Sequence, residues 1–133
     1  MRRAIVALAL LAHLALNGNA VLAQDAARNM TLELPRALAA GETAYIEVQV
    51  GPIGRGRTIE VTTAAGQPLG TVSPFGVRTG QDAGTYPVPV PKDAIRDGRL
   101  SIRLTISQPG GSARAPTADE VRSVKLGVGP APR

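Results

Sequence analysis

The sequence predicts an all-β fold: a small antiparallel β-sandwich of two sheets and about seven strands, which follows an N-terminal signal peptide. Apolar and polar residues alternate from about residue 29 onward, as they do along strands with one buried face. Glycine and proline interrupt this pattern at short intervals, so a helix longer than about two turns has no room to form.

The first residues have the layout of a secretory signal. Arg2 and Arg3 precede an uncharged run rich in Ala and Leu, residues 4–16, and small residues that suit cleavage follow at Ala20 and Ala23. The run is shorter than the roughly 20 helical residues that span a bilayer, so we expect no stable membrane anchor after cleavage. Cleavage is expected after Ala23, with Ala20 as the alternative.

Three segments follow from this layout. Residues 1–23 form the cleavable signal peptide, residues 24–128 the β-sandwich, and residues 129–133 a disordered Pro-rich tail. The signal and the bias toward Ala, Arg, Gly and Pro indicate a bacterial protein that is periplasmic or secreted. The chain has no cysteine, so aliphatic side chains packed between the sheets must stabilise it without disulfides.

Four strands are predicted in the first half of the domain. The first ends at Pro35, and the turn at residues 64–67 joins the last two as a hairpin. The predicted strands cover residues 30–34, 43–50, 58–63 and 68–72. The side chains expected to point inward are aliphatic: Ala44, Ile46, Val48, Val50, Ile59 and Val61.

A proline-rich strand, residues 85–91, is expected after a long loop at residues 73–84. Its residues alternate between two sets, Tyr86, Val88 and Val90 against Pro87, Pro89 and Pro91. Alternate amides of a strand point to the same edge and proline has no amide proton, so one edge of this strand lacks donors. The strand must therefore lie at the edge of a sheet. The prolines either protect this edge from aggregation or leave it to contact a partner through side chains.

Two further strands are predicted near the C-terminus, residues 99–107 and residues 121–128. The segment between them is rich in Pro, Gly and Ser at residues 108–116, which predicts a mobile loop. The side chains expected to point inward are Leu100, Ile102, Leu104, Ile106, Val124, Leu126 and Val128.

The late part of the chain resembles a known class of module. Residues 84–91 form an aliphatic strand that ends in proline, and a short turn with Asp-Gly leads from it into a Leu/Ile strand. Residues 84–128 are similar to the late strands of bacterial jelly-roll, galactose-binding-like sandwich modules, with 121–126 in place of their final strand. Residues 112–117 depart from the Asp-Arg and Leu-Gly pattern common in that group, and we carry over no binding residue. The resemblance implies a sandwich, jelly-roll or immunoglobulin-like, and favours a binding role.

The composition excludes the common catalytic chemistries. The only histidine, His13, is removed with the signal, and there is no cysteine. We therefore expect no cofactor, no metal or haem site of the usual kinds, and no Ser-His-Asp or Cys-His nucleophile. A carboxylate pair could still act, but no spacing selects one; Asp93 and Asp97 are expected to cap a short helical turn at residues 92–98. An enzyme is not expected.

The charge pattern argues against a nucleic-acid partner. The formal charge of +5 falls to +3 once Arg2 and Arg3 are removed with the signal. The remaining cations are spread along the chain among the acids, and no basic stripe is visible.

The candidate binding surface combines arginines with one aromatic side chain. Arg55 and Arg57 lie in a Gly-Arg-Gly-Arg run between two predicted strands, where they form either a solvated loop or a site for carboxylate or phosphate. Phe75 and Arg78 lie in the long loop, and Phe75 either caps the core or acts as a hot spot for a partner. If the loops meet at one end, these residues form a small cationic, partly apolar patch.

Carbohydrate recognition usually needs aromatic rings, and the mature domain offers few. Tyr86 is in phase with the core, whereas Tyr45 points to the opposite face of its strand from Ile46, where a ligand could reach it.

The sequence thus predicts an exported, non-catalytic binding or assembly accessory that contacts a protein partner. A glycan-binding module that recognises a cell-envelope polysaccharide is the alternative, and a carboxylate-based hydrolase is the third hypothesis.

Overall fold

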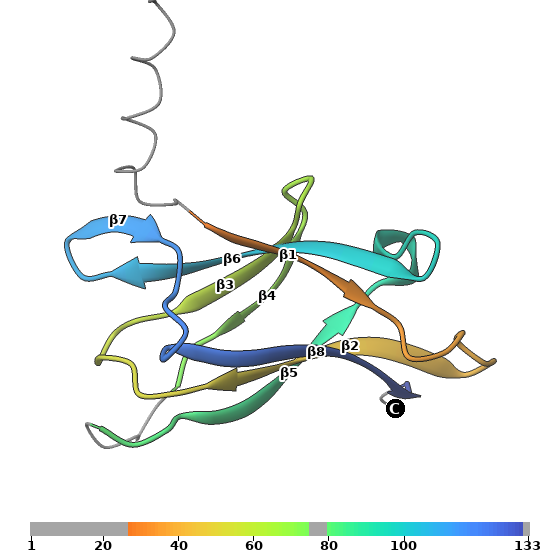
Figure 1. Ribbon diagram of the computed structural model, residues 1–133, viewed down its shortest axis with the longest axis horizontal. Helices are drawn as coiled ribbons and strands as arrows, with labels where there is room; N and C mark the ends of the chain where they lie inside the picture. Colours follow the sequence, from red (N-terminus) through yellow and green to blue (C-terminus); the bar gives the residue numbers. More distant parts are fainter. Residues whose placement is uncertain (1–26, 75–79, 132–133) are drawn as a thin grey trace, which may run out of the picture.

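The computed structural model describes residues 27–74 and 80–131 (Figure 1). The predicted signal peptide, Phe75 and Arg78 lie outside the described residues. The described residues form eight strands: β1 Arg28–Glu33, β2 Glu42–Val50, β3 Ile59–Thr63, β4 Pro68–Val72, β5 Gly84–Val90, β6 Arg99–Gln108, β7 Gly111–Arg114 and β8 Val121–Pro130. A short 3-10 turn, η3 Lys92–Ala94, follows β5. No helix in the described part of the chain is long and apolar enough to cross a membrane.

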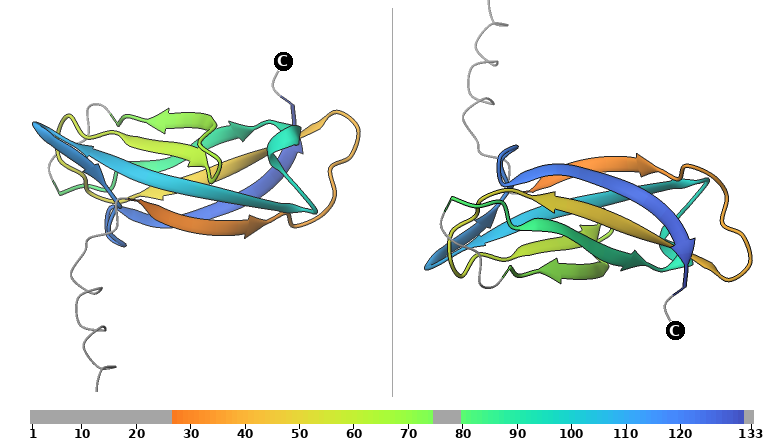
Figure 2. Two further views of the ribbon diagram at one scale, coloured as in Figure 1. Left: turned by 90° about the horizontal axis from the view of Figure 1, so that it is seen from above. Right: turned by 90° about the horizontal axis from the view of Figure 1, so that it is seen from below.

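The strands form two antiparallel sheets, which confirms the predicted all-β class. One sheet has the strand order β1-β6-β3-β4, and β7 pairs with the end of β6 that extends beyond β1. The other sheet has the order β5-β2-β8. The two sheets form the upper and lower layers in Figure 1, and Figure 2 views the molecule from above and from below.

The buried side chains of both sheets form one core, and those that compose it in the described residues are all aliphatic. Burying a Val, Leu or Ile side chain contributes about 1.5–3 kcal/mol, so strand alternation puts these residues inside. Tyr86 packs against the core, as predicted, and its hydroxyl donates to the Ala83 carbonyl over 2.7 Å. Val124 also packs against the core, whereas Val128 is only half-buried. The predicted inward residues that are buried are Ala44, Ile46, Val48, Val50, Ile59, Val61, Leu100, Ile102, Leu104, Ile106 and Leu126.

Strand β5 lies at an edge of the three-stranded sheet, as its prolines predicted. Among the described strands it pairs only with β2, and Tyr86, Val88 and Val90 alternate with Pro87 and Pro89 along this pairing. Because proline has no N–H, the donors that reach β2 come from the first set, and the prolines remove the donors from the outer edge.

The turn between β5 and β6 is closed by Asp-Gly as predicted, and it differs from the prediction in how it is capped. The helical turn is present as η3, but its N-cap is Pro91 and no side-chain hydrogen bond caps it, so Asp93 and Asp97 do not have the expected role. Asp97 instead has a φ of 53°, and Gly98 has a φ of 73°. Two consecutive positive angles are those of a type I′ hairpin turn, which Asp-Gly favours.

The segment 108–116, expected to be a mobile loop, contains strand β7. Pro109 and Gly110 form the turn that leads into it, and Gly110 has a φ of 70°. β7 then pairs with β6 through Ile106 and Gln108. Glycine and serine have low strand propensity, but the unpaired end of the long strand β6 supplies hydrogen-bond partners that outweigh it.

Strand β8 continues beyond the predicted end of the domain. Gly129 and Pro130, expected in a disordered tail, pair with Thr43 and Glu42 of β2. The Ala131 amide then donates to the Gly41 carbonyl over 3.1 Å. The long strand β2 therefore orders this part of the C-terminal segment.

A β-bulge changes the direction of one core side chain. Gln49 pairs with Ser123 but Val50 pairs with Val121, so β8 has one extra residue at this point. Val121 is fully buried although it is out of phase with Val124 and Leu126. The alternating pattern of β8 did not predict this position.

Candidate functional site

Two loops meet at the end of the molecule where β2 ends and β8 begins. The β2–β3 loop, residues 51–58, lies against the turn at residues 117–120 that precedes β8. The Gly51 amide donates to the Glu120 carbonyl over 2.9 Å. A Cβ atom at Gly51 would collide with the carbonyl oxygen of Asp119, so only glycine permits this close contact.

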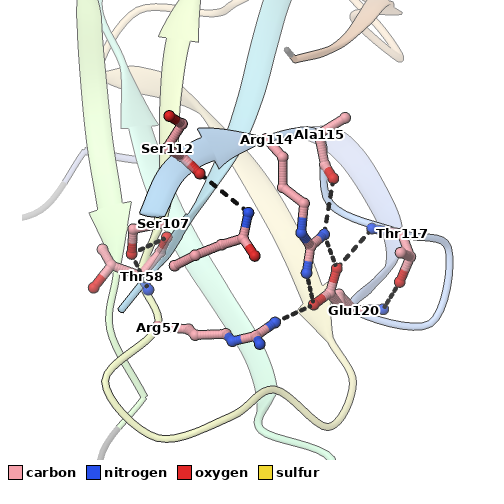
Figure 3. Close-up of polar contacts among 9 residues, drawn as sticks. Arg57, Thr58, Ser107, Ser112, Arg114, Ala115, Thr117 and Glu120 are labelled. Carbon is pink, nitrogen blue, oxygen red and sulfur yellow. Dashed lines mark hydrogen bonds and ion pairs between the residues drawn. The ribbon is translucent and has the colours of Figure 1, made fainter. Parts of the chain in front are cut away.

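Glu120 is the centre of the polar contacts at this end (Figure 3). Arg114 binds its carboxylate with both terminal nitrogens, over 2.7 and 2.8 Å. Arg57 donates to Glu120 Oε2 over 3.2 Å, and the Thr117 amide donates to Oε1 over 2.9 Å. The Glu120 amide donates back to Thr117 Oγ1 over 3.2 Å. We call Arg57, Arg114, Thr117 and Glu120 the Glu120 cluster.

The cluster keeps Glu120 ionised. Its side chain is 11% exposed, against 22% for Arg114. The hydrogen bonds from Arg114 lower the pKa of Glu120 from 4.5 to about 2, helped by the Thr117 amide and opposed by burial of the carboxylate. The same hydrogen bond raises the pKa of Arg114. At neutral pH the site thus holds a carboxylate whose acceptor positions are occupied, so Glu120 is poorly suited to accept a proton as a general base.

The structure brings two of the predicted binding residues to this end, in different roles. Arg57 belongs to the Glu120 cluster, and its side chain is 30% exposed. Arg55 is exposed in the turn of the same loop, and no ion pair joins it to another described residue. The loop therefore presents one arginine to solvent and uses the other as an anchor.

The other predicted binding residues are not joined to this pair. Phe75 and Arg78 lie outside the described residues, although both ends of their connection are close to the cluster's end. Ser73 Oγ lies 3.2 Å from Thr58 Oγ1, and the Ala83 amide donates to the Val50 carbonyl over 3.0 Å.

Tyr45 lies in the middle of the outer face of the three-stranded sheet, far along β2 from the loop. It pairs with Gly127 of β8 and Pro89 of β5. Its ring covers Gly127 and Gly129, and a Cβ atom at Gly129 would collide with the Tyr45 hydroxyl and ring. Tyr45 is thus half-buried and packs on its own sheet.

Three other carboxylates in the described chain each pair with one arginine, and Glu42 binds Arg36 over 2.7 Å. Asp82 binds Arg122 over 3.0 Å, and the exposed Glu33 lies 3.4 Å from Arg99. Within residues 27–74 and 80–131, no three His, Cys, Asp or Glu side chains gather in a way that could hold a metal ion.

The residues that sequence reasoning missed are Glu120 and Arg114. One signal was available, because Thr117 and Glu120 have the Thr-x-x-Glu spacing of a capping box. No comparable pattern points to Arg114, which reaches Glu120 only because β7 pairs with β6.

In comparisons with known proteins, no family model, no curated protein and no solved structure matches this chain.

Proposed function

We propose that the protein is an exported, non-catalytic binding or assembly accessory that contacts a protein partner in the bacterial periplasm or outside the cell. The signal layout of residues 1–23 supports export. The absence of histidine and cysteine from the rest of the sequence supports a role without metal or nucleophilic chemistry. Glu120 is the most buried acid among the described residues, and its carboxylate already accepts hydrogen bonds from Arg114, which supports a structural role for this acid.

We infer that the two sheets are a β-sandwich of the immunoglobulin-like type rather than a jelly roll. The single core shared by both sheets supports a sandwich. In immunoglobulin-like domains the second and fifth strands pair in one sheet, and the third and sixth strands pair in the other. Here β2 pairs with β5, and β3 pairs with β6. Such domains commonly bind partners with the loops at one end of the sandwich.

The observation that carries the proposal is the anchored β2–β3 loop. Arg57 ties the loop to Glu120, and the contact of Gly51 with the 117–120 turn fixes its start. Arg55 is held exposed on this support, and a loop ordered in advance loses less conformational entropy when it binds. An exposed arginine on a rigid loop suits an acidic protein surface.

The test compares two charge reversals at opposite ends of the molecule. Arg55→Glu changes the anchored loop, and Arg96→Glu makes the same change in net charge at an exposed position in the β5–β6 turn (Figure 1). A photoreactive amino acid at position 54 in the β2–β3 loop should cross-link a partner in the cell envelope. Arg55→Glu should lower this adduct about tenfold, and Arg96→Glu should leave it unchanged.

Equal adduct yields in both variants would exclude the loop as the binding surface.

Export has a separate test, because the mature N-terminus measured by mass spectrometry should be Gln24 or Val21. A chain that retains Met1 in the mature protein would contradict the signal peptide.

A further inference from the structure

Strand β8 has a long outer edge that no other described strand covers. It is ten residues long and pairs only with β2, at the end of the three-stranded sheet. The opposite edge of the same sheet is β5, where Pro87 and Pro89 remove outward donors. The two edges of one sheet therefore differ: one is blocked and the other can accept a strand.

The positions of the prolines in β5 show, through the alternation of backbone groups across the sheet, which groups of β8 point outward. Tyr86 and Val88 must donate to β2, so their partners Val48 and Ile46 direct their backbone groups toward β5. The other residues of β2 then direct their backbone groups toward β8. Two hydrogen bonds agree with this: the Gly51 amide donates to the Glu120 carbonyl, and the Gly41 carbonyl accepts from the Ala131 amide. By the same alternation, the residues of β8 opposite Val48, Ile46 and Ala44 direct their N–H and C=O groups to the outer edge. These residues are Val124, Leu126 and Val128.

This outer edge is limited at both ends. Arg28 donates to the Val121 carbonyl over 3.1 Å at one end. At the other end Pro130 has the same outward phase as Val128 and no N–H to offer. Between these ends, no hydrogen bond from the described residues reaches the outward backbone groups of Val124, Leu126 or Val128. The edge thus presents three residues, each with one donor and one acceptor.

A groove beside this edge is lined by residues of β8, β1 and the start of β6. Figure 2 (right) shows β8 next to β1, which belongs to the other sheet. It has a volume of about 770 Å³, and Leu32, Val124 and Leu126 supply its apolar surface. Side chains of a strand added to β8 would enter this groove on the core side, because cross-strand neighbours share a face.

We propose that the occupant of this edge is a second copy of the same chain, which adds its own β8 in antiparallel orientation about a two-fold axis at Leu126. This register pairs Leu126 with the partner's Leu126, and Val124 with the partner's Val128. Each of the three pairs exchanges two backbone hydrogen bonds. All three pairs are apolar on the core side, so the edge is complementary to itself, as a two-fold interface requires.

The side chains on the outer face of the paired β8 strands are also compatible with this register. Lys125 lies opposite the partner's Gly127, so no like charges face each other directly, and Glu47 is the cross-strand neighbour of Lys125 within its own chain. A register shifted by one pair would place Lys125 against the partner's Lys125. The favoured register creates a continuous sheet of order β5-β2-β8-β8-β2-β5, and both of its outer edges then carry the prolines of β5.

The first experiment measures assembly and amide exchange on the mature protein. Sedimentation velocity over a range of concentrations should show a reversible monomer–dimer equilibrium. Amide exchange followed by NMR should slow with protein concentration at Val124, Leu126 and Val128. Exchange at Ser123, Lys125 and Gly127, whose amides already donate to β2, should not change with concentration.

The second experiment uses one position and two opposite charges. A Cβ atom at Gly127 meets only an ordinary contact with the Tyr45 ring, at 3.7 Å, so a substitution there starts without a collision. Gly127→Glu would face Lys125 of the other copy and should strengthen the dimer. Gly127→Lys would face the same lysine and should weaken it, so that the two dissociation constants differ by about tenfold or more at low salt.

Several results would overturn the proposal. A protein that stays monomeric at millimolar concentration has no such interface, even if β8 binds an extended segment of another protein. A dimer with equal affinity in Gly127→Glu and Gly127→Lys uses another surface. Thermal unfolding of both variants controls for folding. Val128→Pro provides a second control, because it removes one outward donor, spares the bonds to β2, and should weaken the dimer. The inference does not depend on the proposed partner of the β2–β3 loop.

Discussion

At the scale of single residues, Glu120 is the most informative position. Removing a carboxylate from water is costly unless hydrogen bonds and opposite charges replace the lost hydration. Both oxygens of Glu120 accept two hydrogen bonds each, three from arginine nitrogens and one from the Thr117 amide. Four bonds fill the acceptor capacity of a carboxylate, so burial of this group is compensated within the cluster.

Glu120→Gln should destabilise the protein at pH 7. The amide keeps the shape of the side chain but leaves Arg57 and Arg114 without a counter-charge in a poorly hydrated position. We expect the free energy of unfolding in urea to fall by about 2–4 kcal/mol. Glu60→Gln is the matched control, because Glu60 is exposed on β3 and should change stability by less than about 0.5 kcal/mol. Equal effects in both variants would show that the cluster contributes nothing.

The lowered pKa of Glu120 makes stability depend on pH in a definite window. The folded value of about 2 lies below the unfolded value of 4.5, so the folded state favours the ionised form. The resulting stabilisation is complete above pH 4.5 and is lost as the pH falls toward 2, by about 3 kcal/mol in total. Urea unfolding between pH 7 and pH 2 should show this loss in the wild type. In Glu120→Gln the loss should be smaller by that amount, and parallel curves would contradict the assignment.

The candidate site was predictable from the sequence only in part. The Gly-Arg-Gly-Arg run identified the loop, and glycine proved necessary at Gly51, just before it, and in the turn of the loop at Gly56, where φ is 74°. The sequence could not assign different roles to Arg55 and Arg57. Only Arg57 binds Glu120, and that carboxylate lies 63 residues away from Arg57 in the sequence. Distant partners of this kind are decided by the fold.

At the scale of elements, the outer face of the three-stranded sheet is stabilised by one aromatic ring over two glycines. Glycine weakens a strand because it has no side chain to pack. Tyr45 of β2 covers Gly127 and Gly129 of β8, and the ring supplies the contact that these residues lack. The strand β8 thus keeps its pairing with β2 through a segment with low strand propensity.

Gly129→Ala tests this arrangement. The added methyl group would collide with the Tyr45 ring, so the ring must move, and stability should fall by about 1–3 kcal/mol. Gly127→Ala is the matched control on the same strand, where the nearest ring atom is 3.7 Å from the added carbon and no loss is expected. In a Tyr45→Ala background, Gly129→Ala should no longer be destabilising when measured by thermal unfolding. A loss that persists there would assign the effect to the backbone.

At the scale of the whole molecule, the two sheets depend on each other. Ile46 of β2 and Ile102 of β6 belong to different sheets but to the same core, and each is about 1% exposed or less. Neither sheet covers its own apolar face, so neither should persist alone.

We therefore expect the mature protein to unfold in one cooperative transition. Ile46→Val and Ile102→Val should each lower the free energy of unfolding by about 0.5–1.5 kcal/mol and move that same transition. Circular dichroism and tyrosine fluorescence should report coincident curves for both variants. Two separate transitions would show that the sheets fold independently.

The sequence by itself determined seven of the eight described strands, most of their buried faces and one sheet edge. These features are local, because alternation along β2 and β6 and the prolines of β5 act through the geometry of a single strand. This local signal does not depend on which strand is the neighbour, and the predicted inward residues are buried except for Val124 and Val128, which are half-buried.

Only the tertiary structure decided the features that depend on a neighbour. β7 and the end of β8 formed from Gly- and Pro-containing segments because β6 and β2 offered unpaired backbone groups. Val121 points into the core because of a bulge against Val50, and the pKa of Glu120 is lowered because β7 brings Arg114 to it. Hydrogen bonds and ion pairs between residues far apart in the sequence depend on which strands pair, and strand pairing depends on the fold of the whole molecule.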